Sequence, residues 1–339
     1  MIRVLTKYED IDINQWNDLL FNRSSVASFF QSPESYNFHS RFKWMDTLVF
    51  GVDEDKKLVG IAVVTIYHEG KGIMRQLTSR AIINGGPLLA DDISSECVTA
   101  LLLAIKKQLR HRCIFIETRN YKDYSQWKDT FDACDFNYKP HYNFHIDTSQ
   151  PKAAWERFQK SRRRTIRRAT EAGAYISECE QGNTEEPTKF YSILSDLYKI
   201  KIHKPLPPIE FFIELARQPF GKVFIIHNPD GEIIGGQVCV ILKNKAIYAW
   251  YCCGLDHDHT YYHPSVLANY AGIKYAVENN IPLMDMMGAG SPGDNGYGVR
   301  EFKAQFGGQL VEHGRFLFLC NPLIYHLGKW VITLKEKLS

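Results

Sequence analysis

One series of structural signals occurs twice in this sequence, at positions separated by about half its length. Each half has a strand, a polar turn and a second strand carrying a glycine, over Val49 to Gly60 and over Val223 to Gly235. A helical stretch, an apolar strand and a phenylalanine-anchored segment follow in the same order. The offsets are 175, 168 and 171 residues, between Gly60 and Gly235, Glu117 and Asp285, and Phe131 and Phe302. Three features in one order favour two tandem domains over chance resemblance between hairpins.

Length and composition agree with this division. With 339 residues, each half has enough chain to bury its own core. A hydrophobic content of 45% and a charged content of 23% are typical of globular proteins. Strands and helices alternate in each half, which predicts an α/β (α+β) fold with a mixed sheet flanked by helices in each domain. We place the domains at 1–150 and 151–339, and expect the strands at 138–146 and 314–319 to close the first and second sheet respectively.

Charge and cysteine content argue against several classes of protein. A net charge of +3 is too small to indicate nucleic-acid binding by itself. Eight cysteines at irregular spacing, several inside apolar strands, are typical of reduced core residues in a cytoplasm. No leader-like segment opens the chain, and no apolar run approaches the length of a bilayer span. We therefore expect a cytoplasmic protein.

The stretch Tyr297 to Gly308 is the strongest candidate for a site. It follows an apolar strand, 281–287, and a glycine-rich loop that contains Gly288 and Gly290. Its centre, Phe302–Lys303, places a cation beside an aromatic anchor, an arrangement that can set one ammonium at the floor of a cleft. The upstream copy, Phe131 to Phe136, has no lysine. The two copies predict a single working site in the second domain and a non-catalytic first domain.

An arginine-rich segment lies between the two repeats. Five arginines occur within seven residues, and Ile166 and Ala169 share a helical face with Arg162. Guanidinium groups bind phosphate oxygens in pairs and stay charged at physiological pH. A phosphate clamp and a solvated helix face are both open interpretations. The candidate phosphate-binding residues are Arg163, Arg164, Arg167 and Arg168.

Further candidates flank the lysine. Tyr248 and Tyr251 lie on one predicted strand, where alternation places them on opposite faces of the sheet. Each is a candidate for shaping a pocket or relaying a proton, with core packing as the alternative. Arg300 is close enough in sequence to act with Lys303, and Asp285 is either a base or a cap for the next loop.

At four places the residues resemble a known family, the FemABX-type peptidyl aminoacyltransferases and their relatives with twin acetyltransferase-like (GNAT) domains. The matching segments are Phe30-Gln31-Ser32, Asn84-Gly85-Gly86-Pro87, the helix ending Ile166-Arg167-Arg168-Ala169, and Phe302-Lys303-Ala304-Gln305-Phe306-Gly307. The resemblance implies two tandem GNAT-like domains, a charged tRNA as a frequent acyl donor, and a cell-wall peptide amine as acceptor. It also implies that Lys303 acts on the acyl donor or on the developing oxyanion.

The sequence departs from the family at two points. After Gln31-Ser32, no lysine appears before Lys43, where the family often has one that meets a nucleotide diphosphate. No extended heptad pattern marks the long helical arm of some members. An ordinary GNAT enzyme holds the coenzyme A diphosphate on a glycine-bearing turn at a helix N-terminus. The matching loop here, 257–264, has no glycine. Its His257, Asp258, His259 and His263 lack helical histidine spacing, so we interpret them as surface polar residues and expect no metal site.

Together these features predict an acyltransferase that acts in cell-wall peptidoglycan or surface-polysaccharide synthesis and holds no permanently bound cofactor. We expect Lys303, Arg300 and Tyr251 to be catalytic. The predicted substrate-binding residues are the four arginines above with Tyr248, Phe302, Gly288 and Gly290. The donor is an aminoacyl-tRNA or an acyl-CoA, and the acceptor is an amine on a precursor that is lipid-linked in one interpretation.

Two alternatives stay open: an acyl-CoA-dependent N-acetyltransferase for a sugar amine, and a non-catalytic binder of a phosphorylated glycan or lipid. The last segment, 322–338, is an amphipathic helix, for which packing on the second domain and contact with a membrane surface are both considered.

Overall fold

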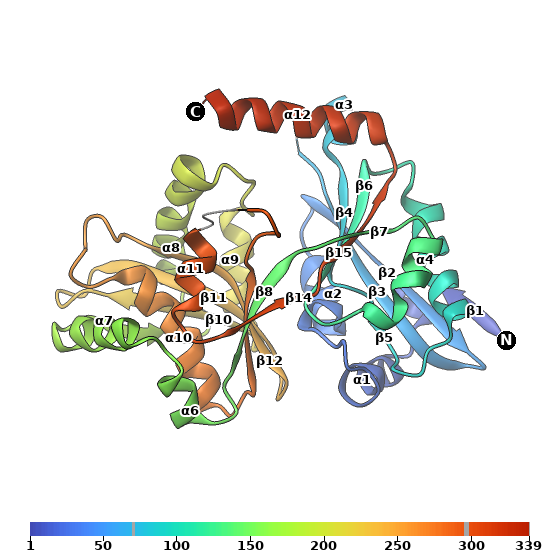
Figure 1. The fold of residues 1–339 in the computed structure, drawn as a ribbon. Coiled ribbons are helices and arrows are strands. Elements are labelled where there is room, and N and C mark those ends of the chain that lie inside the picture. Colours follow the sequence, from blue (N-terminus) through green and yellow to red (C-terminus); the bar gives the residue numbers. More distant parts are fainter. Residues whose placement is uncertain (70–71, 295–297, 339) are drawn as a thin grey trace. The chain divides into compact units, whose positions relative to one another are not determined.

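The computed structural model describes residues 1–69, 72–294 and 298–338. The chain forms two compact units, Met1–His141 with Glu312–Ser339, and Tyr142–Val311. These ranges differ from the expected 1–150 and 151–339, because a segment near the middle and the C-terminal segment join units other than the ones assigned from the sequence. Each unit is described by itself below (Figure 1).

The first unit is built on a mixed sheet in the order β1-β2-β3-β4-β6-β15-β7, with β5 paired to β3. Its strands are β1 (Ile2–Leu5), β2 (Met45–Glu54), β3 (Lys57–Tyr67), β4 (Arg80–Gly85), β5 (Leu88–Leu89), β6 (Phe115–Asn120), β7 (Asn137–Lys139) and β15 (Arg315–Leu319). Its α-helices are α1 (Ile13–Asn22), α2 (Pro33–His39), α3 (Ile73–Thr78), α4 (Ser95–Leu109), α5 (Lys128–Ala133) and α12 (Pro322–Leu338).

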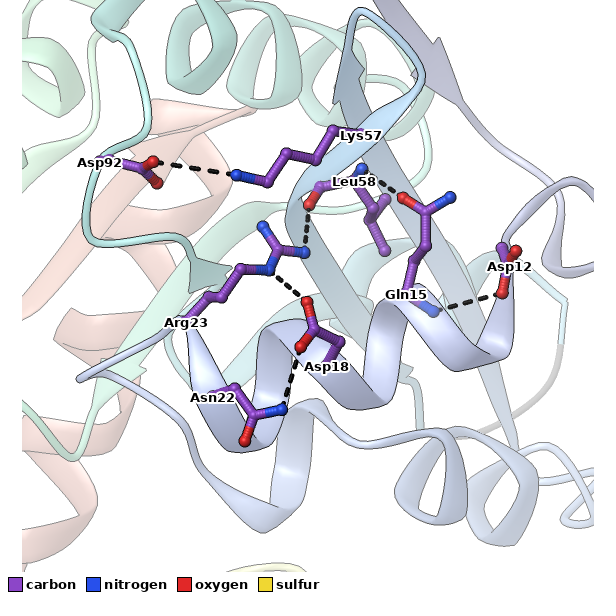
Figure 2. Close-up of polar contacts among 8 residues, drawn as sticks. All are labelled: Asp12, Gln15, Asp18, Asn22, Arg23, Lys57, Leu58 and Asp92. Atoms are coloured by element: carbon purple, nitrogen blue, oxygen red, sulfur yellow. Dashed lines mark hydrogen bonds and ion pairs between the residues drawn. The ribbon is translucent and has the colours of Figure 1, made fainter.

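Polar contacts fix helix α1 against the β2–β3 turn (Figure 2). Asp12 caps the helix by accepting hydrogen bonds from the backbone N–H groups of Asn14 and Gln15. At the turn, the side chain of Gln15 accepts a bond of 2.8 Å from the Leu58 N–H, and Arg23 donates one of 2.8 Å to the Leu58 carbonyl. The two ends of helix α1 therefore bind the backbone N–H and the backbone carbonyl of Leu58.

The second unit has a seven-stranded sheet in the order β14-β8-β13-β12-β11-β10-β9. The strands are β8 (Tyr142–Asp147), β9 (Tyr175–Glu178), β10 (Gly221–His227), β11 (Ile233–Leu242), β12 (Ala246–Gly254), β13 (Leu283–Gly288) and β14 (Gln309–Glu312). The helices are α6 (Pro151–Glu156), α7 (Lys160–Glu171), α8 (Glu185–Leu197), α9 (Ile209–Ala216), α10 (Pro264–Glu278) and α11 (Gly298–Ala304).

The two sheets repeat one plan. In each, antiparallel strands lead to one parallel pair, β4 with β6 in the first sheet and β12 with β13 in the second. The strand beyond that pair is antiparallel and comes from the other half of the sequence: β15 beside β6, and β8 beside β13. This shared order supports the duplication that the sequence indicated.

The assignment of the closing strands from the sequence was therefore wrong. The C-terminal strand β15 joins the first sheet, where Phe316 stacks on Phe131 with ring centroids 4.2 Å apart. Strand β8 joins the second sheet and contributes Phe144 and Ile146 to its core. The apolar residues of a strand show that it is buried but not in which sheet, so partner choice depends on packing that sequence periodicity does not express.

Helices cover both faces of the second sheet (Figure 1). Helix α10 packs closely on one face because glycines leave room for it. A Cβ on Gly272 would lie 2.4 Å from Gln237 Oε1, and one on Gly254 would lie 2.4 Å from the Ser265 backbone nitrogen. Helices α8 and α9 cover the other face, where Phe212 contacts Tyr251. The close approach of α10 brings its N-terminus to the end of β12.

Candidate active site at the parted strands β12 and β13

The two parallel strands of the second sheet separate near their carboxyl ends. Strands β12 and β13 pair at Ile247–Met284 and Tyr248–Asp285, and no further ladder pair joins the described residues of these strands. Beyond this point the facing edges of the two strands do not pair with each other, and their backbone groups need other partners. In an α/β sheet this is a common place for a substrate to bind.

A β-bulge at Trp250 changes the direction of the side chains on β12. Val238 pairs with Tyr251 and Val240 pairs with Tyr248, with a register shift between them. Since Val238 and Val240 point to the same face, Tyr248 and Tyr251 do so too. The expectation that they lie on opposite faces was wrong, because the extra bulge residue reverses the alternation.

Tyr248 is buried, and Tyr251 is half-buried on the face covered by α8 and α9. The Tyr251 ring lies 5.0 Å from that of Phe212 and 6.4 Å from that of Tyr198, measured between centroids. This aromatic environment favours pocket shaping over proton relay for Tyr251.

Lys303 lies at the parted end of β13. From helix α11 its ammonium donates hydrogen bonds to the carbonyl oxygens of Met286 at 2.5 Å and Gly288 at 2.8 Å, with Met287 at 3.4 Å. An ammonium has three N–H donors, so two are firmly used and the third is held weakly. Burial lowers the pKa of Lys303 to about 8, opposed by the charge of Asp285. The site therefore holds one cation, only partly exposed, whose third donor is held weakly by the Met287 carbonyl.

Asp285 lies beneath this lysine and is fully buried. One of its carboxylate oxygens accepts a hydrogen bond of 2.7 Å from the Met287 N–H, which fixes the left-handed conformation of that residue. The other lies 3.3 Å from Nε2 of His145, on the neighbouring strand β8. Asp285 is thus a loop cap that also stabilises the charge of Lys303, as one of the two sequence interpretations proposed.

Arg300 binds the glycine loop. Its guanidinium donates bonds of 2.9 Å to the Ala289 carbonyl and 2.8 Å to the Ser291 carbonyl, and lies 4.9 Å from the centroid of the Tyr142 ring. Gly290 adopts a φ of +81°, which favours glycine, and its carbonyl accepts a bond from the Tyr142 N–H. These contacts give Arg300 a role in shaping the loop. Gly296 and Tyr297 of the predicted motif lie outside the described residues.

The aromatic residues of the motif anchor helix α11. Phe306 is buried, and Phe302 packs against it with centroids 5.6 Å apart. The guanidinium of Arg162 stacks over both rings, at 4.6 and 4.9 Å, and donates a bond of 2.6 Å to Gln305 Oε1. Phe302 therefore positions its neighbour Lys303, and Arg162 joins the arginine-rich helix to the motif.

The N-terminus of helix α10 does not fit a coenzyme A diphosphate. The Asp256 carboxylate accepts a bond of 3.1 Å from the Ser265 N–H and a second from the Ser265 hydroxyl. A carboxylate thus takes a backbone donor that a phosphate would need, and its charge repels an anion. The loop 257–264, which has no glycine, therefore leads into a helix N-terminus that is unsuited to a diphosphate.

Cys252 is a further residue of the site. It lies on the parted stretch of β12, and Asn269 of α10 donates a bond of 3.2 Å to its sulfur. Burial raises the pKa of this thiol to about 12, while the nearby charge of Lys303 lowers it. The thiol is therefore neutral and is not an activated nucleophile.

Four of the five clustered arginines lie away from this pair of strands. Arg164, Arg167 and Arg168 are exposed on α7. Arg163 is half-buried and donates bonds to the carbonyls of Glu156 and Phe158. With Lys160 and Glu171 they line a surface hollow of about 540 Å³. The structure thus separates two groups of predicted site residues, Lys303 with its loop and the arginine face.

Sequence reasoning missed His145, Cys252, Asn269 and Asp256. His145 was assigned to the first sheet, so its pairing with Asp285 was not foreseen. Asn269 is a polar residue on the buried side of α10. A polar residue that interrupts an apolar helix face can mark a functional position, and this was the one indication that the hydrophobic periodicity gave for Asn269.

The first unit has no equivalent cation at the corresponding position. Helix α5 carries Phe131 and Asp132 where α11 carries Phe302 and Lys303. Its other two motifs meet each other: Gln31 is buried, exchanges hydrogen bonds with the backbone of Val63, and donates one of 2.8 Å to the Asn84 carbonyl. These contacts hold the first sheet together.

Helix α12 forms as the sequence predicted. Its Tyr325 ring packs edge-on against Phe115, with centroids 5.5 Å apart, and the helix belongs to the first unit, whereas the sequence interpretation had considered packing on the second domain. Among the described residues, no helix combines the length and apolarity needed to cross a bilayer.

Two mixed sheets of one plan, one of them with a lysine at the parted parallel strands, define a protein with twin GNAT-like domains. Residues 217–332 match the FemAB family, which covers the motif helix and the glycine loop. The crystal structure of FemX is similar over the whole fold, with a TM-score of 0.71 at 13% identity, covering 96% of this chain and 99% of FemX. The resemblance to the FemABX-type, twin GNAT-like family is thereby confirmed.

Two further solved structures share the fold. A tandem GNAT protein from the clavulanic acid biosynthesis pathway has a TM-score of 0.58 at 10% identity, covering 95% of this chain and 99% of that one. The L-PGS of Bacillus licheniformis has a TM-score of 0.55 at 11% identity, covering 86% and 93%. No curated protein matches the chain. The FemAB match supports a Fem-like acyl or aminoacyl transferase, and the solved structures show the fold.

Proposed function

We propose that this protein transfers an aminoacyl group from a charged tRNA to an amine of a cell-wall precursor. The observation that carries the proposal is the position of Lys303, which places one ammonium, with its third donor only weakly held at 3.4 Å, at the parted end of β13. Because an aminoacyl-tRNA donor and a peptidoglycan-precursor acceptor are found in the cytoplasm, the reaction takes place there.

The chemistry is aminolysis of an ester. The lone pair of the neutral acceptor amine attacks the aminoacyl carbonyl, a C–N bond forms, and the carbonyl oxygen gains negative charge. When the intermediate collapses, the C–O bond to the tRNA ribose breaks and the proton lost by the amine goes to the ribose oxygen. The N–H of Lys303 that the Met287 carbonyl holds weakly turns to the oxyanion and stabilises it, and its effect is strong because the ammonium is only partly exposed to water.

The helix N-terminus at α10 favours a tRNA donor over an acyl-CoA. Asp256 takes backbone and hydroxyl donors of Ser265, at the place where the GNAT turn holds a diphosphate. An aminoacyl ester at the 3′ end of a tRNA has no diphosphate that this turn would have to bind. This supports the aminoacyl-tRNA among the donors considered.

The donor is tested by incubating the full chain with charged tRNA and, separately, with a panel of acyl-CoA thioesters. Both reactions contain an amine-bearing peptidoglycan precursor and an amino sugar, and the products are read by mass spectrometry. We expect an aminoacylated precursor from charged tRNA and no acylated product from the thioesters. Acyl transfer from a thioester alone would refute the proposed donor, and tight binding of a phosphorylated glycan without any transfer would favour a non-catalytic role.

A further inference from the structure

The solvent-facing side of helix α7 is a continuous row of cations. Lys160, Arg163, Arg164, Arg167 and Arg168 follow one another at spacings of three, one, three and one, which places all five on one face of the helix. From the first to the last the row extends over about 12 Å, given a rise of about 1.5 Å per residue. These residues, with Glu171 at one end, line the hollow of about 540 Å³ on the surface of the second unit. We call this set the α7 cation row.

The row is not neutralised by the protein. Within the described part of the chain, no ion pair joins any of its five side chains to a carboxylate; Arg163 bonds two backbone carbonyls and Arg167 lies over the Trp155 ring. Like charges four residues apart destabilise a helix. The opposite face of α7 holds the helix in place, because Arg162, Ile166 and Ala169 are buried in the core. The fold therefore maintains a row of cations against their mutual repulsion.

The chemistry of the row indicates its partner. Guanidinium forks bind phosphate oxygens in pairs, and a row of several turns addresses several phosphates at once. A membrane-binding helix has large apolar side chains beside its cations, ready to insert into lipid. In α7 the apolar side chains face the protein's own core, and the exposed face has none among its cations. The row therefore matches a polyanion that stays in water.

We propose that the α7 cation row binds the phosphate backbone of RNA, and that it holds the body of the tRNA whose aminoacyl end is used at Lys303. This inference rests on the proposed function for the identity of the RNA, but binding through the row is a separate property. Phosphate contacts carry no sequence information, so the row supplies affinity, and recognition of the aminoacyl group falls to other residues.

The test measures binding of fluorescein-labelled, uncharged tRNA to the full chain by anisotropy, over a series of NaCl concentrations. We expect Arg164→Gln/Arg168→Gln to bind roughly tenfold more weakly and to reduce the slope of log K against log salt by about two, one for each lost phosphate contact. A matched control, Lys204→Gln/Lys243→Gln, removes two exposed cations elsewhere on the second unit. We expect less than a twofold effect from it, since these residues lie outside the row.

Three results would overturn the inference: equal weakening by both double variants, no weakening by either, or binding to vesicles of anionic phospholipid with no binding to tRNA. The outcomes also separate the two proposals. If the protein transfers from charged tRNA and Arg164→Gln/Arg168→Gln binds tRNA as tightly as the wild type, RNA binding by the α7 cation row is refuted and the proposed function stands. If the row binds tRNA but the protein transfers from acyl-CoA alone, the proposed function is refuted and RNA binding by the row stands.

Discussion

At the scale of single residues, Lys303 combines two roles that are usually separate. Its ammonium closes the end of β13 by binding the carbonyls of Met286 and Gly288, and it also brings a positive charge to the parted strands. Burial makes the charged form costly, while Asp285 offsets part of that cost. A cation held at such a balance is common at functional sites, since a purely structural cap gains little from a perturbed pKa.

Replacing this lysine separates the two roles. We expect Lys303→Ala to lower the rate of transfer by about 100- to 1,000-fold, the usual effect of losing one oxyanion donor. The fold is expected to survive, because the lost hydrogen bonds are offset by removal of a partly buried charge, and the unfolding midpoint should move by less than about 5 °C. Single-turnover rates and thermal unfolding by circular dichroism check both parts. Wild-type rates in the variant would show that Lys303 is only a cap.

The pH dependence follows from the lowered pKa. Lys303 is active when protonated, and with a pKa of about 8 its charged fraction falls tenfold per unit as the pH rises beyond that value. We expect the transfer rate, at saturating neutral acceptor, to decline above about pH 8. In Lys303→Arg the side chain stays charged at every pH used, so the rate should be lower overall but without the decline. A decline that persists in Lys303→Arg would assign it to another group.

Sequence reasoning at this scale worked where a residue's chemistry was independent of its neighbours. Lys303 stood out beside Phe302 and the glycines, and the structure places its ammonium at the end of β13, while its role in catalysis stays a prediction. Asp256 did not stand out, because a carboxylate near a helix start is common and its significance depends on a backbone donor of Ser265 nine residues away. The roles of Tyr251 and Arg300 in catalysis stay predictions.

At the scale of elements, the short helix α11 depends on Gly307, the last residue of the motif that begins at Phe302. Gly307 has a φ of +70°, and a Cβ there would lie 2.1 Å from the carbonyl oxygen of Arg157. That oxygen belongs to the backbone at the end of α6, so it has little freedom to move aside. The final glycine of the motif is therefore required by packing between two elements.

This requirement can be measured. We expect Gly307→Ala to destabilise the protein by at least about 2 kcal/mol, from left-handed strain together with the clash. Gly182→Ala is a matched control, because Gly182 has a φ of +92° with nothing within 4 Å of its added Cβ, so strain alone should cost about 1 kcal/mol. Denaturant unfolding of both variants checks the difference. Equal losses would show that the contact with Arg157 relaxes freely.

The helices and hairpins were predictable because their signals are local. Helix α1 begins after the capping residue Asp12, and helix α10 begins with Pro264, a residue common in the first turn of a helix. The bulge at Trp250 was not predictable, because it is defined by the register between two strands. A bulge adds one residue to one strand, and the sequence of that strand alone does not reveal the addition.

At the scale of the whole molecule, the chain is duplicated, but neither half of the sequence contains all the strands of one sheet. Each sheet takes the strand beside its parallel pair from the other half, β15 in the first sheet and β8 in the second. Strand β8 alternates polar and apolar residues and β15 is mostly apolar, but neither pattern says which sheet the strand joins. Two domains could be predicted from the sequence, and the exchange of closing strands could not.

This exchange predicts which fragments fold. A fragment 142–311 contains all seven strands of the second sheet except the last residue of β14, whereas 151–339, the division suggested by the sequence, lacks β8. Without β8, strand β13 loses its antiparallel neighbour, and the core loses Phe144 and Ile146. We expect the first fragment to unfold cooperatively on heating and the second to be unfolded or aggregated, as circular dichroism and size-exclusion chromatography would report. Since Lys303 binds carbonyls of β13, disorder in that strand would also release the ammonium. Cooperative unfolding of 151–339 with a midpoint equal to that of 142–311 would mean that β8 contributes little, and that the support of the candidate site lies elsewhere in the second sheet.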